Sequence, residues 1–190
     1  MTNLNVPDSA SVSPWPSILR LGLIGGLIFI VVAMVSNLTG FSVPTSMMGV
    51  IASLVVSIAL AVGLCIYAVR QHREQELGGY ITFPRALLVG FMVLLIASLV
   101  SGVFNYMYVG FIDPGFAEAA IQKTSEWMES MGMTASQIEE QLTAMEARLT
   151  PMGMLKQSLI GAPIISLIIG LIVAAVMKRN RPVLDDVLDN

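Results

Sequence analysis

Four long stretches of the chain consist almost entirely of apolar residues, and the segments between them are rich in polar and turn-forming residues. A helix that crosses the hydrocarbon core of a bilayer, about 30 Å thick, needs roughly 20 apolar residues in a row. Each of the four stretches reaches that length. The pattern therefore predicts an all-α protein, a four-helix transmembrane bundle in a single domain, with spans at about residues 18–38, 47–69, 87–109 and 158–177.

The segment between the third and fourth predicted spans, residues 114–150, follows a different pattern. A turn sequence, Asp-Pro-Gly at residues 113–115, is followed by two short runs with apolar residues at helical spacing. Thr134 and Gln137 have the spacing of a capping box at the start of the second run. We expect an amphipathic helical hairpin that lies over the outer mouth of the bundle or in the head-group plane.

Basic residues are concentrated on one side of the predicted bundle. The positive-inside rule places connections rich in Lys and Arg in the cytoplasm. The connection at residues 37–46 carries no charge, and the hairpin segment is acidic. Both termini, including the tail at residues 178–190, are therefore expected in the cytoplasm, and the hairpin is expected outside it. The basic side is defined by Arg20, Arg70, Arg73, Arg85, Lys178, Arg179 and Arg181.

Small residues recur at intervals of four positions in the predicted spans. Because lipid provides little hydrophobic force between helices, close backbone approach at small residues drives their association. The stripes therefore predict helix–helix contacts, within one chain or between chains. They are Gly22 and Gly26 in the first span, Gly49, Ser53, Ser57, Ala61 and Cys65 in the second, Ser98 and Gly102 in the third, and Ala162, Ser166, Gly170 and Ala174 in the fourth.

Composition narrows the function classes further. Charged residues make up 12% of the 190 residues, against about 25% in soluble domains. A net charge of −3 provides no basic stripe for nucleic acid. One Cys and one His exclude a disulfide framework and metal clusters built on these residues. We therefore expect no metal, no cofactor and no nucleic-acid partner.

Polar residues inside membrane spans usually mark function, and few are present here. The interiors of the second, third and fourth spans carry no ionisable side chain, which disfavours proton relays, ion-coupled carriers and voltage sensors. Cys65 is interpreted as a small buried packing residue, and His72 as a solvated interfacial histidine. Arg70, Arg73 and Arg85 are candidates for contacts with anionic lipid head groups, although the topology rule alone explains them.

The richest polar and aromatic region lies at the outer end of the third span. One interpretation makes it an aromatic-lined external pocket that the hairpin covers. The other makes it an interfacial aromatic belt, with Asn105 bonding across helices. The candidate pocket or interface residues are Asn105, Tyr106, Tyr108, Asp113 and Trp127.

Three segments also carry a resemblance to a known family. They are the loop at residues 78–86 (GGYITFPRA), the region 105–116 with its Asn-Tyr-Met-Tyr and Ile-Asp-Pro-Gly-Phe motifs, and the closing Lys178-Arg179. In these features the chain resembles bacterial membrane proteins of the domain of unknown function family 4199. The resemblance implies a four-span inner-membrane protein and extends from the first span to Arg179. It implies no activity, cofactor or catalytic residue.

Three functions follow as hypotheses. The first is a non-catalytic accessory or interaction subunit of the bacterial inner membrane, which contacts the bilayer and binds another membrane protein or a second copy of itself. The second is a small oligomeric carrier or channel for an apolar or lipid-like solute. The third is a lipid-directed enzyme that uses Asn105 and the hairpin carboxylates, and exposure of those carboxylates to bulk solvent would argue against it. They are Glu118, Glu126, Glu129, Glu139, Glu140 and Glu146.

Overall fold

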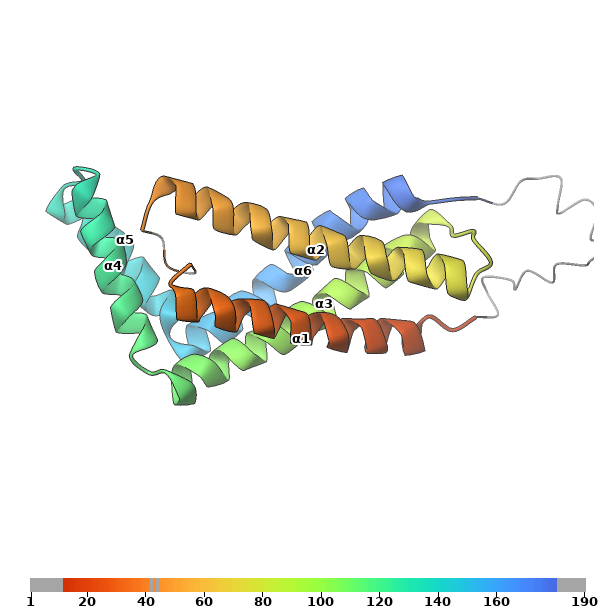
Figure 1. Ribbon diagram of the computed structural model, residues 1–190, viewed down its shortest axis with the longest axis horizontal. Helices are drawn as coiled ribbons and strands as arrows, with labels where there is room; N and C mark the ends of the chain where they lie inside the picture. Colours follow the sequence, from red (N-terminus) through yellow and green to blue (C-terminus); the bar gives the residue numbers. More distant parts are fainter. Residues whose placement is uncertain (1–11, 42, 44, 181–190) are drawn as a thin grey trace, which may run out of the picture.

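The computed structural model describes residues 12–41, 43 and 45–180 of the chain (Figure 1). Over these residues the protein is all-α, as predicted. The predicted tail lies outside the described residues from position 181 onward. The elements are α1 (Trp15–Thr39), α2 (Met47–Gln75), α3 (Phe83–Met107), a π-helical turn η1 (Tyr108–Ile112), α4 (Phe116–Ser130), α5 (Ala135–Leu149) and α6 (Pro151–Met177).

The four predicted spans correspond to α1, α2, α3 with η1, and α6, which are long and apolar enough to cross a membrane. The fourth span begins earlier than predicted. Thr150 ends α5 and also caps α6, because its side-chain oxygen accepts a hydrogen bond from the backbone N–H of Gly153 at 2.9 Å. Pro151 occupies the first turn of α6, where its missing N–H is tolerated. A single residue therefore separates the hairpin from the last span.

The helices form a bundle with the described chain ends at one end and the α4–α5 hairpin at the other (Figure 1). We refer to these as the termini end and the hairpin end. Helix α3 packs against each of the other three long helices, and α6 is its most extensive neighbour. The buried core occupies the half of the bundle near the termini end. Its fully buried side chains include Ile18, Cys65, Val69, Val89, Val93 and Ala174.

Three of the four small-residue stripes pack within the chain. A Cβ at Gly26 in α1 would lie 2.7 Å from Cβ of Val100, and a Cβ at Gly90 in α3 would lie 2.7 Å from Sγ of Cys65. These distances require glycine, because real side chains do not approach so closely. Gly102 likewise faces Ser158 of α6. The α2 stripe is the exception, since only its termini-end member Cys65 is buried.

Helices α4 and α5 form the predicted hairpin. The capping box is confirmed, with the backbone N–H of Thr134 donating to Oε1 of Gln137 at 3.0 Å. Gly132 makes the turn with a φ of 78°, a left-handed conformation that favours glycine. Ala120 and Ile138 lie on the buried faces of the two helices. The hairpin is thus a folded element that packs through α5 on α6.

Candidate functional site

A polar cleft opens at the hairpin end of the bundle, on the face of α3 that carries Ser98, Ser101 and Asn105. These three residues are spaced three and four positions apart, so their side chains lie on one side of the helix. One arm of the cleft has a volume of 500 Å³ and reaches the hairpin. It is lined by Phe29, Asn37, Ser98, Ser101, Gly102, Asn105, Val109, Phe116, Leu149, Met154, Gln157, Ser158 and Gly161.

A second arm, of 450 Å³, runs between α1, α2 and α3. The ribbons of α1 and α2 diverge toward the hairpin end (Figure 1), and this arm lies in the space between them. Ser53, Ser57 and Leu60 of α2 form part of its wall. The two arms share Phe29, Asn37, Ser101 and Asn105. We therefore treat them as one cleft, with these four residues at its centre.

The lining of this cleft combines apolar side chains with uncharged polar ones: no Asp, Glu, Lys or Arg of the described part of the chain contributes to it. The hydroxyl of Ser57 donates to a backbone carbonyl of its own helix at 2.7 Å. By contrast, the side chains of Asn37, Ser101 and Asn105 form no hydrogen bond with any described residue. The three side chains are partly exposed, so they present polar atoms to the cleft, where water or a ligand can pair with them.

The other predicted site residues lie elsewhere. Tyr108 is buried, at 7% exposure, and its hydroxyl donates to Oδ2 of Asp113 at 3.3 Å. Its ring meets Phe116 edge-on with the centroids 5.9 Å apart, which joins α3 to the hairpin. Tyr106 packs against Phe111 instead. The half-buried Trp127 of α4 does not line the cleft. Of the five predicted pocket residues, Asn105 lines the cleft. Tyr106, Tyr108 and Asp113 instead make structural contacts at the hairpin end of α3.

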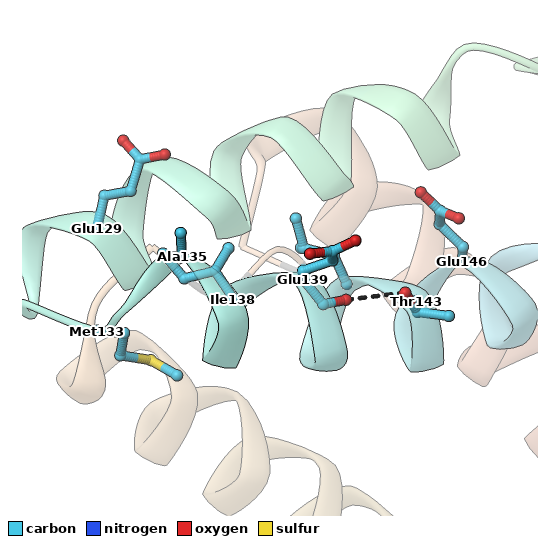
Figure 2. Close-up of a pocket in the computed structure, with 8 residues that line it drawn as sticks. Glu129, Met133, Ala135, Ile138, Glu139, Thr143 and Glu146 are labelled. Carbon is cyan, nitrogen blue, oxygen red and sulfur yellow. Dashed lines mark hydrogen bonds between the residues drawn. The ribbon is translucent and has the colours of Figure 1, made fainter.

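A separate open groove of 640 Å³ lies along the hairpin itself (Figure 2). Its apolar part is formed by Met133, Ala135, Ile138 and Leu142. Figure 2 shows Glu129 and Glu146 extending from positions well apart along the groove. The dashed line in Figure 2 marks the hydrogen bond that the hydroxyl of Thr143 donates to the backbone carbonyl of Glu139, at 2.8 Å.

The hairpin carboxylates do not converge on a reaction centre. All six that the sequence singled out are exposed. Glu139 and Glu146 are seven residues apart, about 10 Å along the helix axis, and Figure 2 shows the side chains of Glu129, Glu139 and Glu146 at separate places on the groove. Among the described residues, no group of three His, Cys, Asp or Glu side chains is arranged to hold a metal.

At the termini end, the interpretation of His72 as a solvated residue is wrong. His72 is 0% exposed, and its Nε2 accepts a hydrogen bond from Nε of Arg85 at 3.1 Å. Its Nδ1, which must then carry the proton, lies 3.0 Å from Oε2 of Glu76, too bent for a well-aligned hydrogen bond. Ser17 donates to the other oxygen of Glu76. This network joins α1, α2 and α3. Residue spacing along one helix could not predict it, because its members come from three helices.

The three arginines considered for lipid contacts differ in their surroundings. Arg70 is exposed, with 64% of its side chain accessible, and pairs with Glu74. Arg73 is largely covered and donates to the backbone carbonyl of Met177 at 3.3 Å. Arg85 donates to His72 and to the carbonyl of Val12. Lipid contact therefore stays a prediction that suits Arg70 best, since the other two hold helices together.

Sequence reasoning missed most of the cleft. Asn37, Ser101 and Ser158 come from three different helices, and no local pattern joins them. One signal was present in the third span, where Ser98, Ser101 and Asn105 repeat at helical spacing in an otherwise apolar helix. The structure is required for the rest, because the cleft depends on the divergence of α1 and α2.

The four long apolar helices, with a polar cleft among them and a hairpin at one end, define a multi-pass membrane protein. Residues 20–179 match a family described as "Protein of unknown function (DUF4199)". The chain therefore belongs to the DUF4199 family, as its motifs predicted. Comparison with curated proteins and with solved structures gives no match.

Proposed function

We propose that this protein is a non-catalytic accessory subunit of the bacterial inner membrane, which binds another membrane protein through the hairpin-end half of α2. The observation that carries this proposal is the incomplete packing of α2. Only 6% of its most apolar stretch is buried, against 28–33% in the other three long helices. Helix α2 is thus the span with the most surface available to a second protein.

The exposed face of α2 suits a partner helix. Ile51, Leu54, Val55 and Ile58 lie on one side of the helix, because each is three or four residues from two of the others, and all are about half exposed. Van der Waals packing drives helix association in lipid. A continuous ridge of branched apolar side chains gives a partner helix a surface to interdigitate with. We therefore assign this ridge as the docking face.

The non-catalytic role and the orientation are part of the same proposal. The exposed, separated hairpin carboxylates support a binding role over an enzymatic one. Arg70, Arg73, Arg85, Lys178 and Arg179 lie at the termini end, and the positive-inside rule supports a cytoplasmic location for it. The acidic hairpin would then face the periplasmic side.

Affinity purification of the tagged full chain from its host in mild detergent, followed by mass spectrometry, tests the proposal. A stoichiometric membrane protein is expected with the native chain. Val55→Trp on the docking face should reduce its recovery about tenfold, a loss of about 1.4 kcal/mol. Ile164→Trp on the exposed surface of α6 is the matched control and should leave recovery unchanged. Recovery of the protein alone from native membranes would contradict the accessory role.

The uncharged cleft favours one alternative, a small oligomeric carrier or channel for an apolar or lipid-like solute. Transport requires a path that continues through the bundle, whereas the core near the termini end is filled by buried side chains. A carrier must therefore open that core or build its path between copies. Solute flux into vesicles that contain the purified protein alone would establish transport and replace the accessory role.

A further inference from the structure

The polar cleft adjoins an apolar groove. Together they provide a polar region next to an apolar one, and a lipid likewise has a polar head group next to apolar chains. The groove has a volume of 380 Å³ and runs between α1 and α2. Its lining is Ile28, Ala59, Leu60, Gly63, Leu64 and Tyr67, and Leu60 also lines the cleft. The cleft and the groove therefore adjoin at Leu60, and a ligand that passes this side chain would reach from the polar centre at Asn37 and Asn105 to an apolar surface. Each volume lies within or near the range of small-molecule pockets, about 300–1,000 Å³.

The depth of each part in the bilayer agrees with this arrangement. Asn105 is twenty residues along α3 from Arg85, a rise of about 30 Å, equal to the thickness of the hydrocarbon core. If Arg85 lies at one interface, Asn105 lies near the other. From Ser53, which lines the cleft, to Tyr67, which lines the groove, α2 rises about 21 Å. The groove itself covers residues 59–67 of α2, about 12 Å, and it runs from the middle of the bilayer toward the termini end. The cleft and the groove thus pass from a polar interface to the apolar interior.

The chemistry of the centre indicates the head group. Two amides and a hydroxyl, from Asn37, Asn105 and Ser101, provide both donors and acceptors. No charged side chain of the described residues lines the cleft or the groove. The ammonium of Lys123 lies outside this lining, 4.0 Å from where a Cβ at Gly40 would be. A phosphate or ammonium at the centre of the cleft would therefore have no counter-charge in the lining. Hydroxyl groups, in contrast, can both donate to and accept from these side chains. The site is complementary to an uncharged, hydroxyl-bearing head group.

We propose that the cleft and groove bind one membrane lipid with an uncharged, hydroxyl-bearing head group. The head group lies at Asn37, Ser101 and Asn105, and one acyl chain lies along Leu60 and Tyr67. A partner helix is the competing occupant of the groove, but it would leave the amides at the hairpin end without hydrogen bonds. This binding site goes beyond the accessory role proposed above and does not depend on it, because the docking ridge lies on a different face of α2.

The test uses the full chain in phosphatidylcholine nanodiscs and a diacylglycerol that carries a diazirine in one acyl chain. A phosphatidic acid with the same chains and the same diazirine is the charged counterpart. After illumination, mass spectrometry maps the labelled residues. The diacylglycerol is expected to label α2 residues 59–67 and the facing part of α1, with the phosphatidic acid label there about tenfold weaker. Unlabelled diacylglycerol should compete for this label.

Two matched variants sharpen the result. Leu60→Trp fills the junction of cleft and groove and should abolish the specific label. Met48→Trp, at an exposed position of the same helix outside the cleft, the groove and the docking ridge, should retain it. Asn105→Leu keeps the branching and the number of heavy atoms and removes the amide, and it should weaken binding about tenfold through the lost hydrogen bond. The map of the native chain does not depend on the folding of any variant.

Three outcomes would overturn the proposal. The first is label spread evenly over all lipid-facing helices, which indicates annular lipid only. The second is equal labelling by the charged and uncharged probes. The third is a groove that stays unlabelled and cross-links to a second copy of the chain. None of these outcomes bears on recovery of a membrane-protein partner, so failure here and failure of the accessory role are distinguishable.

Discussion

The two ends of this bundle differ in how their polar side chains are arranged. At the termini end, His72, Glu76 and Arg85 contact one another across helices. Ile81 and Arg179 exchange backbone hydrogen bonds of 2.9 and 2.8 Å. At the hairpin end, the side chains of Asn37, Ser101 and Asn105 face a cleft and find no partner among the described residues. At the termini end, polar groups of different helices contact one another, although Gln71 Oε1, His72 Nδ1 and Arg73 Nε have no hydrogen bond among the described residues. At the hairpin end, partly exposed polar groups face an open cleft.

The contrast indicates where stability and where binding are located. Close packing and polar contacts at the termini end hold α1, α2 and α3 together. At the hairpin end, α2 diverges from α1 (Figure 1). Binding sites are usually built on rigid scaffolds in this way. We therefore expect substitutions at the termini end to change stability, and substitutions in the cleft to change binding.

The largest expected effect comes from breaking the polar contacts of the termini end at His72. His72→Ala removes a fully buried side chain and leaves Arg85 and Glu76 without their shared partner. We expect a loss of about 2–4 kcal/mol in the free energy of unfolding, measured as a lower Tm in detergent. Arg70→Ala, on the exposed side of the same helix, should change stability by no more than about 0.5 kcal/mol. Equal effects of the two substitutions would show that the network contributes nothing.

An intermediate effect is expected at the α1–α3 contact. Gly26→Ala places a Cβ 2.7 Å from Val100, so the helices must separate at the point where the closely packed half of the bundle ends. We expect a cost of about 1–2 kcal/mol, measured by thermal unfolding. Gly63→Ala is the control, because a Cβ there meets no atom within 4 Å. A helical Gly→Ala change without a clash should be neutral or stabilising. A harmless Gly26→Ala would mean that α1 and α3 are not in close contact.

The smallest effect is expected where the hairpin joins α3. Tyr108→Phe removes the hydroxyl that donates to Asp113, for an expected loss of about 0.5–1.5 kcal/mol. The loss should appear as faster hydrogen exchange in α4, while α3 near Arg85 stays protected. Tyr106→Phe is the matched control, since its hydroxyl forms no hydrogen bond among the described residues. Unchanged hydrogen exchange in α4 would show that packing of the Tyr108 ring, and not its hydroxyl, holds the hairpin to α3.

Local patterns in the sequence predicted the elements of this fold well. Uninterrupted apolar runs located the spans, and Thr134 with Gln137 located the start of α5. These signals depend only on residues close together in the sequence, so they can be recognised without knowing which helices pack together. The burial of His72 and the cleft at Asn105 depend on how helices from distant parts of the chain meet. A polar residue near a span end has the same sequence pattern whether it is solvated or enclosed.

The turn η1 has a consequence for how the family can vary. The backbone N–H of Asp113 donates to the carbonyl of Tyr108 at 2.8 Å, five residues back instead of the four of an α-helix. Such a turn contains one residue more than regular helix, and each residue advances the helix by about 100°. Because the wider turn absorbs this extra residue, the chain leaves it in nearly the phase of a regular helix. Deleting one residue within 108–112 is therefore expected to convert the wide turn to a regular one and to keep the hairpin near its present direction. A deletion inside α4, where no such turn is present, would instead rotate everything after it by about 100°.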